Sequence, residues 1–178
     1  MEFLNNTKNF GLIVMVLAAI DLVLAVIGIV DSGVGIGTIG AILSPVVMIL
    51  AGLAIFSQTN GGIISFAFPE GSKSKFGALT GFIFATGIAN IVSLTIGGIV
   101  LGIIIVIVGW IITNDKNTFL DSVIWVVLVI LFAISAILGL LGAFSGNIFG
   151  IIGGILSAVL YLMAFLYLLD ADVKKKLM

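Results

Sequence analysis

Asp21 is the residue of this chain whose type and position could do chemistry, because it is the only charged side chain deep inside a long apolar stretch. Placing an aspartate at the centre of a membrane helix costs about 2.5 to 3.5 kcal/mol, so the residue needs a partner or a function. The apolar stretches contain no Lys, Arg or His that could pair with it. We expect Asp21 to be protonated, to face water or an ion, or to hydrogen-bond a neutral partner such as Asn90 or Ser44. These three residues are the candidate intramembrane polar site.

Two interpretations of Asp21 remain open. It is either a proton- or cation-binding carboxylate in a transport path, or an acid that fixes helix packing. Ala18, Ala25 and Gly28 lie on or near its face at helical spacing. This spacing predicts that the Asp21 face packs into a helix bundle rather than turning to lipid.

Enzyme chemistry is disfavoured by the residue types that the chain lacks, which are His, Arg and Cys. Membrane phosphatases, lipid phosphotransferases and serine proteases need such groups to hold phosphate or metal, or to act as a base. The acidic residues Asp115, Asp121, Asp170 and Asp172 fall at predicted helix ends, where solvation or capping explains them better than a metal site. We expect no enzyme, no catalytic, metal-binding or cofactor-binding residue, and no cofactor. The scattered charges also give no patch for nucleic acid.

Composition places the chain in a lipid bilayer, because its 178 residues are 62% hydrophobic and only 8% charged. A water-soluble domain carries roughly a quarter charged residues. At about 20 residues per span, this length holds six helices with short connections and no soluble domain. We therefore predict an all-α, polytopic membrane helix bundle that forms a single domain over 1–178.

The helices that must position the polar residues follow from the apolar runs and their polar breaks. Ser44 precedes Pro45, which should kink the second helix, and the polar cluster around Asn90 splits a run that is too long for one span. The apolar patch 63–68 in the longest connection is expected at the membrane interface. The six predicted helices cover approximately 10–30, 34–56, 76–92, 94–112, 119–140 and 148–169, and they pair as hairpins 10–56, 76–112 and 119–169.

An internal repeat organises these hairpins. The motif Ile39-Gly40-Ala41-Ile42-Leu43 returns at Ile96 and at Ile152, in steps of 57 and 56 residues. Fixed periods of this size are typical of repeated supersecondary units. Small residues four positions apart share a helix face and permit close packing in lipid, which we favour over the alternative of a pore lining. The predicted packing residues are Ala41, Pro45, Gly98, Gly102, Gly154 and Ala158, and the row of the third copy extends back to Gly150 and Gly146.

The lysines predict the orientation. With six spans, all seven lysines fall in segments on one side: the N-terminus, 57–75, 114–118 and the tail 170–178. Positive residues stay on the cytoplasmic side, so we expect a multi-pass protein of the cytoplasmic membrane with both termini cytoplasmic. The exclusive use of Lys beside many Ile and Asn residues hints at an AT-rich prokaryotic genome.

The segments Gly40 to Phe56, Gly97 to Ile112 and Gly153 to Leu169 resemble the second helices in the three hairpins of the short acid-resistance membrane proteins of the HdeD type. The chain is also similar in size and helix number to substrate-binding components of vitamin-type transporters, although its outer loops are nearly bare. We expect a non-enzymatic packing or assembly component of the membrane or of a larger membrane complex. Its partners would be the lipid bilayer and other membrane subunits, or further copies of itself. The alternative is a small transporter or channel for protons or a small solute that uses Asp21, including a transporter's substrate-binding component.

Overall fold

The structure is a computed structural model that describes residues 6–58, 71–114, 118–144 and 147–177. This described part contains seven α-helices and no strand. Six of the helices are long and apolar enough to cross a bilayer, which confirms the predicted all-α membrane fold with six spans. The chain divides into two compact units, Met1–Asn114 and Asp115–Met178, and each is described by itself.

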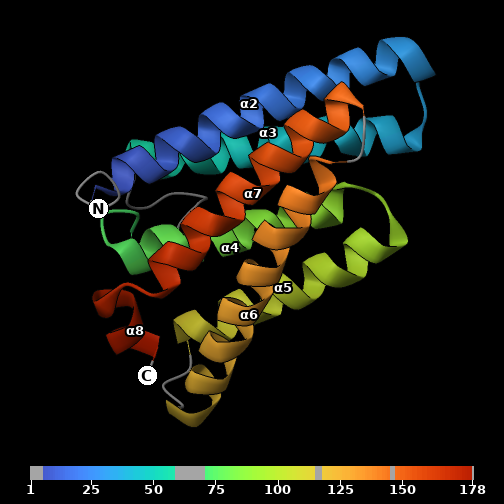
Figure 1. Ribbon diagram of the computed structural model, residues 1–178. Helices are drawn as coiled ribbons and strands as arrows, with labels where there is room; N and C mark the ends of the chain where they lie inside the picture. The colour runs from blue at the N-terminus through green and yellow to red at the C-terminus, as the bar shows by residue number, and fades with distance from the viewer. Residues whose placement is uncertain (1–5, 59–70, 115–117, 145–146, 178) are drawn as a thin grey trace. The chain divides into compact units, whose positions relative to one another are not determined.

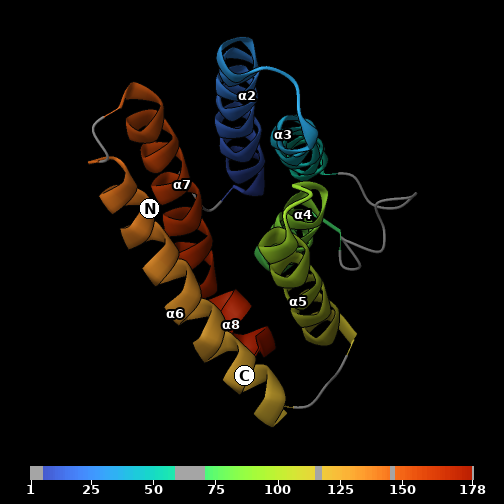
Figure 2. The same ribbon diagram turned by 90° about the vertical axis from the view of Figure 1, so that its right-hand side faces the viewer.

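The first unit consists of two helical hairpins, α2 (Thr7–Ser32) with α3 (Ile36–Phe56), and α4 (Lys75–Val92) with α5 (Ile96–Asn114). In Figure 1 and Figure 2, α4 lies between α3 and α5. Most of α4 is buried, whereas most residues of the other five spans are half-buried or exposed. The interior of this unit is therefore centred on α4.

Polar residues set the helix boundaries in the first unit. The Asn6 side chain caps α2 by accepting from the Lys8 backbone N–H at 3.0 Å, and Ser74 caps α4 in the same way through Gly77. Side-chain oxygens at such positions satisfy backbone donors that have no partner within the helix. At the other end of α2, Gly33 adopts a φ of 84° and donates to the Ile29 carbonyl at 2.8 Å, as glycine C-caps do.

The break between α4 and α5 confirms the predicted split of the long apolar run. Leu94 has a φ of 57°, a left-handed conformation that cannot continue a helix. Ser93 donates to the Asn90 carbonyl at 2.6 Å, and Thr95 accepts from the Gly98 backbone N–H at 3.1 Å. The polar cluster thus turns the chain by supplying hydrogen bonds at both helix ends.

The second unit contains the third hairpin, α6 (Thr118–Gly142) with α7 (Ile148–Leu168), and the short helix α8 (Ala171–Leu177). Asn147 caps α7 by accepting from the Gly150 backbone N–H at 2.6 Å. Helix α8 was not predicted, because the sequence was interpreted as a polar tail. It forms because Val173 and Leu177 are buried while its lysines stay exposed.

The outer surfaces of the spans are apolar. Large side chains in the middle of their helices are about half exposed, among them Val23, Leu50, Ile104 and Leu138. A water-soluble chain would cover such contiguous surfaces, whereas lipid tails solvate them without cost. Such surfaces suit a lipid environment.

Candidate functional site

Asp21 lies in the fifth turn of the apolar span Thr7–Val30, just beyond its midpoint. Its side chain is exposed. Ala18, one turn earlier, is buried. On the face that was predicted to pack, Asp21 itself is exposed, whereas Ala25 and Gly28 are half-buried. The packed stripe of α2 ends at Ala18, and no side chain from Ala19 to Val30 is buried.

Ser44 and Asn90 are not partners of Asp21. The Ser44 hydroxyl donates to the Ala89 carbonyl of α4 at 2.6 Å, and the Asn90 side-chain N–H donates to the Thr86 carbonyl at 2.8 Å. The structure thus brings Ser44 beside the turn that carries Asn90 but leaves Asp21 apart from both. The predicted three-residue polar site is not assembled in the described part of the chain.

The polar side chains of the interior helix α4 bond to its own backbone. Thr80 donates to Gly77 at 3.1 Å, and Thr86 donates to Phe82 at 2.8 Å. Asn90 and Ser93 likewise bond to carbonyls three or four residues earlier. Such back-bonding satisfies a hydroxyl or amide without a second helix. The polarity of α4 therefore does not converge on a binding site.

Each hairpin is instead joined where two glycines face each other. In α2 and α3, a Cβ on Gly11 would lie 2.7 Å from the Gly52 carbonyl oxygen, and one on Gly52 would lie 2.8 Å from that of Gly11. The pairs Gly87 with Gly102 and Gly139 with Gly154 show the same reciprocal approach. A side chain at any of these positions would push the two backbones apart. Close backbone contact of this kind is how helices associate in lipid.

Residues of the predicted small-residue rows lie at or beside these contacts in two of the three hairpins. Gly102, Gly154 and Ala158 are buried between the two helices of their hairpins. Gly98 packs on the turn around Asn90. The first hairpin differs, because Pro45 is buried but Ala41 is exposed. Gly150 is half-buried at the start of α7, and Gly146 lies outside the described residues.

The first hairpin differs because α3 uses its neighbouring face to contact α4. A Cβ on Gly40 would overlap the Ser93 carbonyl group, and four residues later Ser44 bonds to Ala89. Gly40 and Ser44 therefore form the row that packs, one position away from Ala41 and Pro45. Four of the six glycines that pair within the hairpins, Gly11, Gly52, Gly87 and Gly139, lie outside the repeated motif and the small-residue rows aligned with it. Alignment of the motif therefore could not identify them.

The proline of α3 lies within a continuous helix, which runs from Ile36 to Phe56. Proline frees the carbonyl four residues earlier, and a neighbouring serine can satisfy such a group. Ser44 does not do so here, because its hydroxyl bonds across to α4. The serine joins two helices instead of repairing one.

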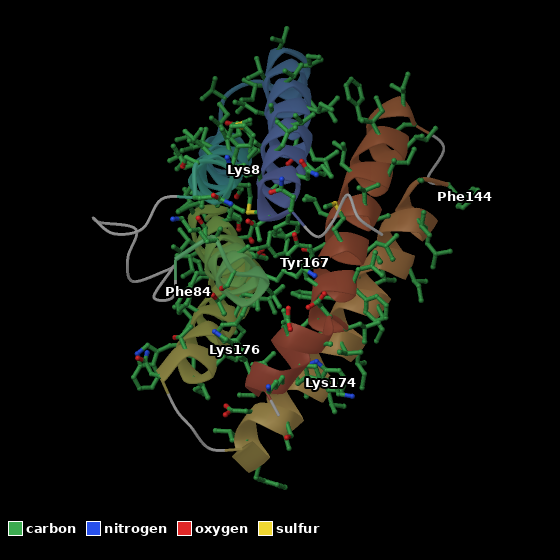
Figure 3. The ribbon with its side chains drawn as sticks, turned by 90° about the vertical axis from the view of Figure 1, so that its left-hand side faces the viewer. Lys8, Phe84, Phe144, Tyr167, Lys174 and Lys176 are labelled. Atoms are coloured by element: carbon green, nitrogen blue, oxygen red, sulfur yellow. The ribbon has the colours of Figure 1, made fainter. Side chains whose placement is uncertain are left out.

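The described lysines of each unit gather at one end of it. In the first unit, Thr7 donates to the Lys73 carbonyl at 3.4 Å, which brings the lysine-bearing starts of α2 and α4 together. In the second unit, Lys174 and Lys176 lie on α8 at one end of the α6–α7 hairpin, and Phe144 lies at the other end (Figure 3). This arrangement agrees, unit by unit, with lysines on one side of the membrane.

Helix α8 is held against the hairpin by Trp125 of α6. The indole N–H donates to the Leu168 carbonyl at 2.9 Å, a group in the last turn of α7 that has no partner in its own helix. Lys174 Nζ lies 5.1 Å from the centre of the Trp125 ring, which is cation–π distance. One side chain thus joins the end of α7, α6 and α8.

The acidic residues at the helix ends have capping positions. The Asp170 carboxylate accepts from the Asp172 backbone N–H at 3.1 Å, and Asp121 lies in the first turn of α6, where the helix dipole favours an acid. Asp121 is buried rather than solvated, and Asp115 lies outside the described residues. Across the described ranges, no three His, Cys, Asp or Glu residues come together as a metal site would require.

These observations define an α-helical, multi-pass integral membrane protein. In its described part, the helices of each hairpin are joined by close backbone contacts between glycines. A scan against protein-family models, a search of curated proteins and a search of solved structures each found no match. The resemblance to HdeD-type proteins therefore stays a prediction.

Proposed function

We propose that the protein is a non-enzymatic subunit of a larger assembly in the cytoplasmic membrane and acts through helix packing. The observation that carries this proposal is the state of the polar groups in the first unit. Ser44, Thr80, Thr86 and Asn90 all donate to backbone carbonyls. Ser44 joins α3 to α4, and the other three satisfy themselves within α4. Donors that are bound in this way offer little to a substrate.

The exterior supports the same proposal. The spans present broad apolar surfaces, and the connections at the end away from the lysines are short, with three residues between α2 and α3 and three between α4 and α5. A protein with so little mass outside the bilayer has mainly its lateral surface for contact with others. Lateral contacts of transmembrane helices depend on packing and hydrogen bonds within the lipid.

The native mass of the protein, extracted gently from its own membrane, tests this proposal. We expect it to migrate with other chains in fixed stoichiometry, and mass spectrometry of the migrating species identifies them. Migration as a single chain, or as copies of itself alone, would contradict the proposal. A matched extraction in a harsh detergent should release the partners, which distinguishes association from co-extraction in a lipid patch.

A second candidate function is a small transporter or channel for protons or a small solute, and the exposed Asp21 carboxyl is the observation that favours it. Such a role needs a hydrated path to this residue. We expect Asp21→Asn to abolish proton or cation flux into liposomes if this function is correct. Unchanged flux in that variant, with wild-type protein active in parallel, would exclude a transport role for Asp21.

A further inference from the structure

Asp21 is the one acid that the described spans place at mid-membrane depth on an exposed helix surface. Its exposed neighbours are apolar, as Ile20 and Val23 illustrate. An ionised carboxylate surrounded by hydrocarbon is costly, and such residues pair with other groups or face water. The Asp21 surface of α2 therefore calls for a covering group.

The first unit does not supply that cover. The buried stripe of α2 consists of Thr7, Phe10, Val14 and Ala18, and the Phe10 ring packs on Phe82 of α4 at 5.6 Å between ring centres. Steps of three and four residues continue this stripe to Asp21. Beyond Ala18 this face of α2 has no buried residue: Asp21 is exposed, and Ala25 is half-buried.

A second copy of the chain does not supply a matching charge either. The chain contains no His and no Arg, and its described lysines lie at the ends of helices or in connections, at Lys8, Lys73, Lys75 and 174–176. A symmetric contact of two α2 helices would bring one carboxylate toward another. Like charges in a medium of low dielectric constant repel strongly.

We propose that the exposed Asp21 face of α2 docks a transmembrane helix of another protein that carries a lysine or arginine at the same depth. This inference rests on the proposed function, because it names the chemistry of the partner in the assembly. The carboxylate pairs with the cation, and each charge removes the insertion penalty of the other. Ala25, one turn further along the same face, leaves room for the partner's backbone.

The test combines a photo-crosslinking residue with charge variants in the full chain, expressed in its native membrane. A crosslinker at position 25 lies on the Asp21 face, and one at position 23 lies on the opposite face of α2. We expect position 25 to capture a span peptide of another protein that contains Lys or Arg, and position 23 to capture none. Capture at position 25 of a second copy, of another segment of this chain or of lipid alone would overturn the inference.

The charge variants test the pairing itself. Asp21→Val should reduce the co-migrating partner about tenfold or more, the change that corresponds to about 1.4 kcal/mol. The double variant Asp21→Val with Val23→Asp keeps the composition but moves the carboxyl to the opposite face, and it should lose the partner equally. Val23→Ala is the control and should retain it. Exchange of the two charges, with Asp21→Lys here and an aspartate in the partner, should restore binding.

The outcomes separate this inference from the proposed function. If the wild-type chain migrates without other proteins, the proposed function fails and this inference fails with it. If the wild-type chain migrates with partners and Asp21→Val still retains them, the protein is a subunit and the inference alone is wrong.

Discussion

Ser44 shows how one hydroxyl contributes to a membrane fold. Its bond to the Ala89 carbonyl, at 2.6 Å, joins α3 to α4 next to the close approach of Gly40 to Ser93. Interhelical hydrogen bonds in membrane proteins contribute about 0.6 kcal/mol on average and up to about 1.7. The short distance and the partly buried position place this bond among those that stabilise the fold measurably.

We expect Ser44→Ala to lower the free energy of unfolding by about 0.5 to 1.5 kcal/mol. Equilibrium unfolding in mixed micelles, followed by circular dichroism, measures the change. Thr113→Val is the control, since Thr113 bonds only within its own helix, to Gly109 and Trp110. An equal loss in both variants would show that the interhelical bond has no special contribution.

Gly102 shows the complementary effect of having no side chain. A Cβ at this position would lie 2.5 Å from the Gly87 carbonyl oxygen and 2.8 Å from the Ile91 backbone nitrogen. Both neighbours are main-chain atoms of α4, which cannot rotate away. An added methyl group would therefore separate α4 from α5.

Gly102→Ala should destabilise the protein by about 1 to 3 kcal/mol, the usual range for overpacking. Gly97→Ala on the same helix is the matched control, because a Cβ there would meet no atom within 4 Å. The control should be neutral or slightly stabilising, since alanine favours helix over glycine. Thermal unfolding of the two variants side by side makes the comparison. Equal melting temperatures would contradict a close packing contact between α4 and α5 at Gly102.

At the scale of elements, Trp125 connects α8 to the hairpin. It donates to the end of α7 and its ring lies under Lys174. A seven-residue helix is too short to be stable alone. Its stability therefore depends on these contacts and on the burial of Val173 and Leu177.

Trp125→Phe keeps an aromatic ring but removes the donor to Leu168. We expect amide hydrogen exchange over residues 169–177 to rise several-fold, because the loss of about 1 kcal/mol permits more frequent opening. Hydrogen–deuterium exchange with mass spectrometry measures this segment. Trp110→Phe, at an exposed indole, is the control and should leave the same peptides unchanged. Equal exchange in the Trp125 variant and in wild type would mean that the indole does not hold α8.

The helix boundaries agreed closely with the sequence, because each depends on local chemistry. Apolar runs of span length define the helices, and capping groups such as Asn147 and Thr95 define their starts. Helix α8 was missed because its two buried side chains acquire their role only from packing against other elements.

At the scale of the whole molecule, the chain forms two compact units, and the prediction of one domain over 1–178 stays a prediction. The described lysines of each unit lie at one end of it. If that end is cytoplasmic in both units, the positive-inside rule is obeyed throughout. This orientation can be tested directly, because the chain has no cysteine.

Single cysteines at exposed positions should report the orientation with a membrane-impermeant thiol reagent applied to intact cells. Val34→Cys and Phe144→Cys, both more than four-fifths exposed, should be labelled. Lys73→Cys and Asp172→Cys, at the lysine ends of the two units, should react only after the membrane is opened. The reverse labelling would place the termini outside, and a mixed result would mean that the two units have opposite orientations.

The sequence alone determined the class of the protein, the number of spans and their approximate ends, and it predicted the side on which the lysines lie. These features depend on composition and on hydrogen bonds between near neighbours in the chain. Of the predicted small-residue rows, Gly102 and Gly154 lie where two backbones approach closely, which a row of small residues permits. Whether the three hairpins are repeats of one unit stays a prediction.

Only the tertiary structure decided which faces meet. The glycine pairs that join each hairpin form between two helices, so Gly11 and Gly87 acquire their role from partners far along the chain. Whether Asp21 is buried or exposed likewise depended on the tertiary structure. The spacing of this residue from Ala18 predicted a packed face, but burial depends on which neighbouring side chains reach each position, and the structure buries Ala18 while it leaves Asp21 exposed.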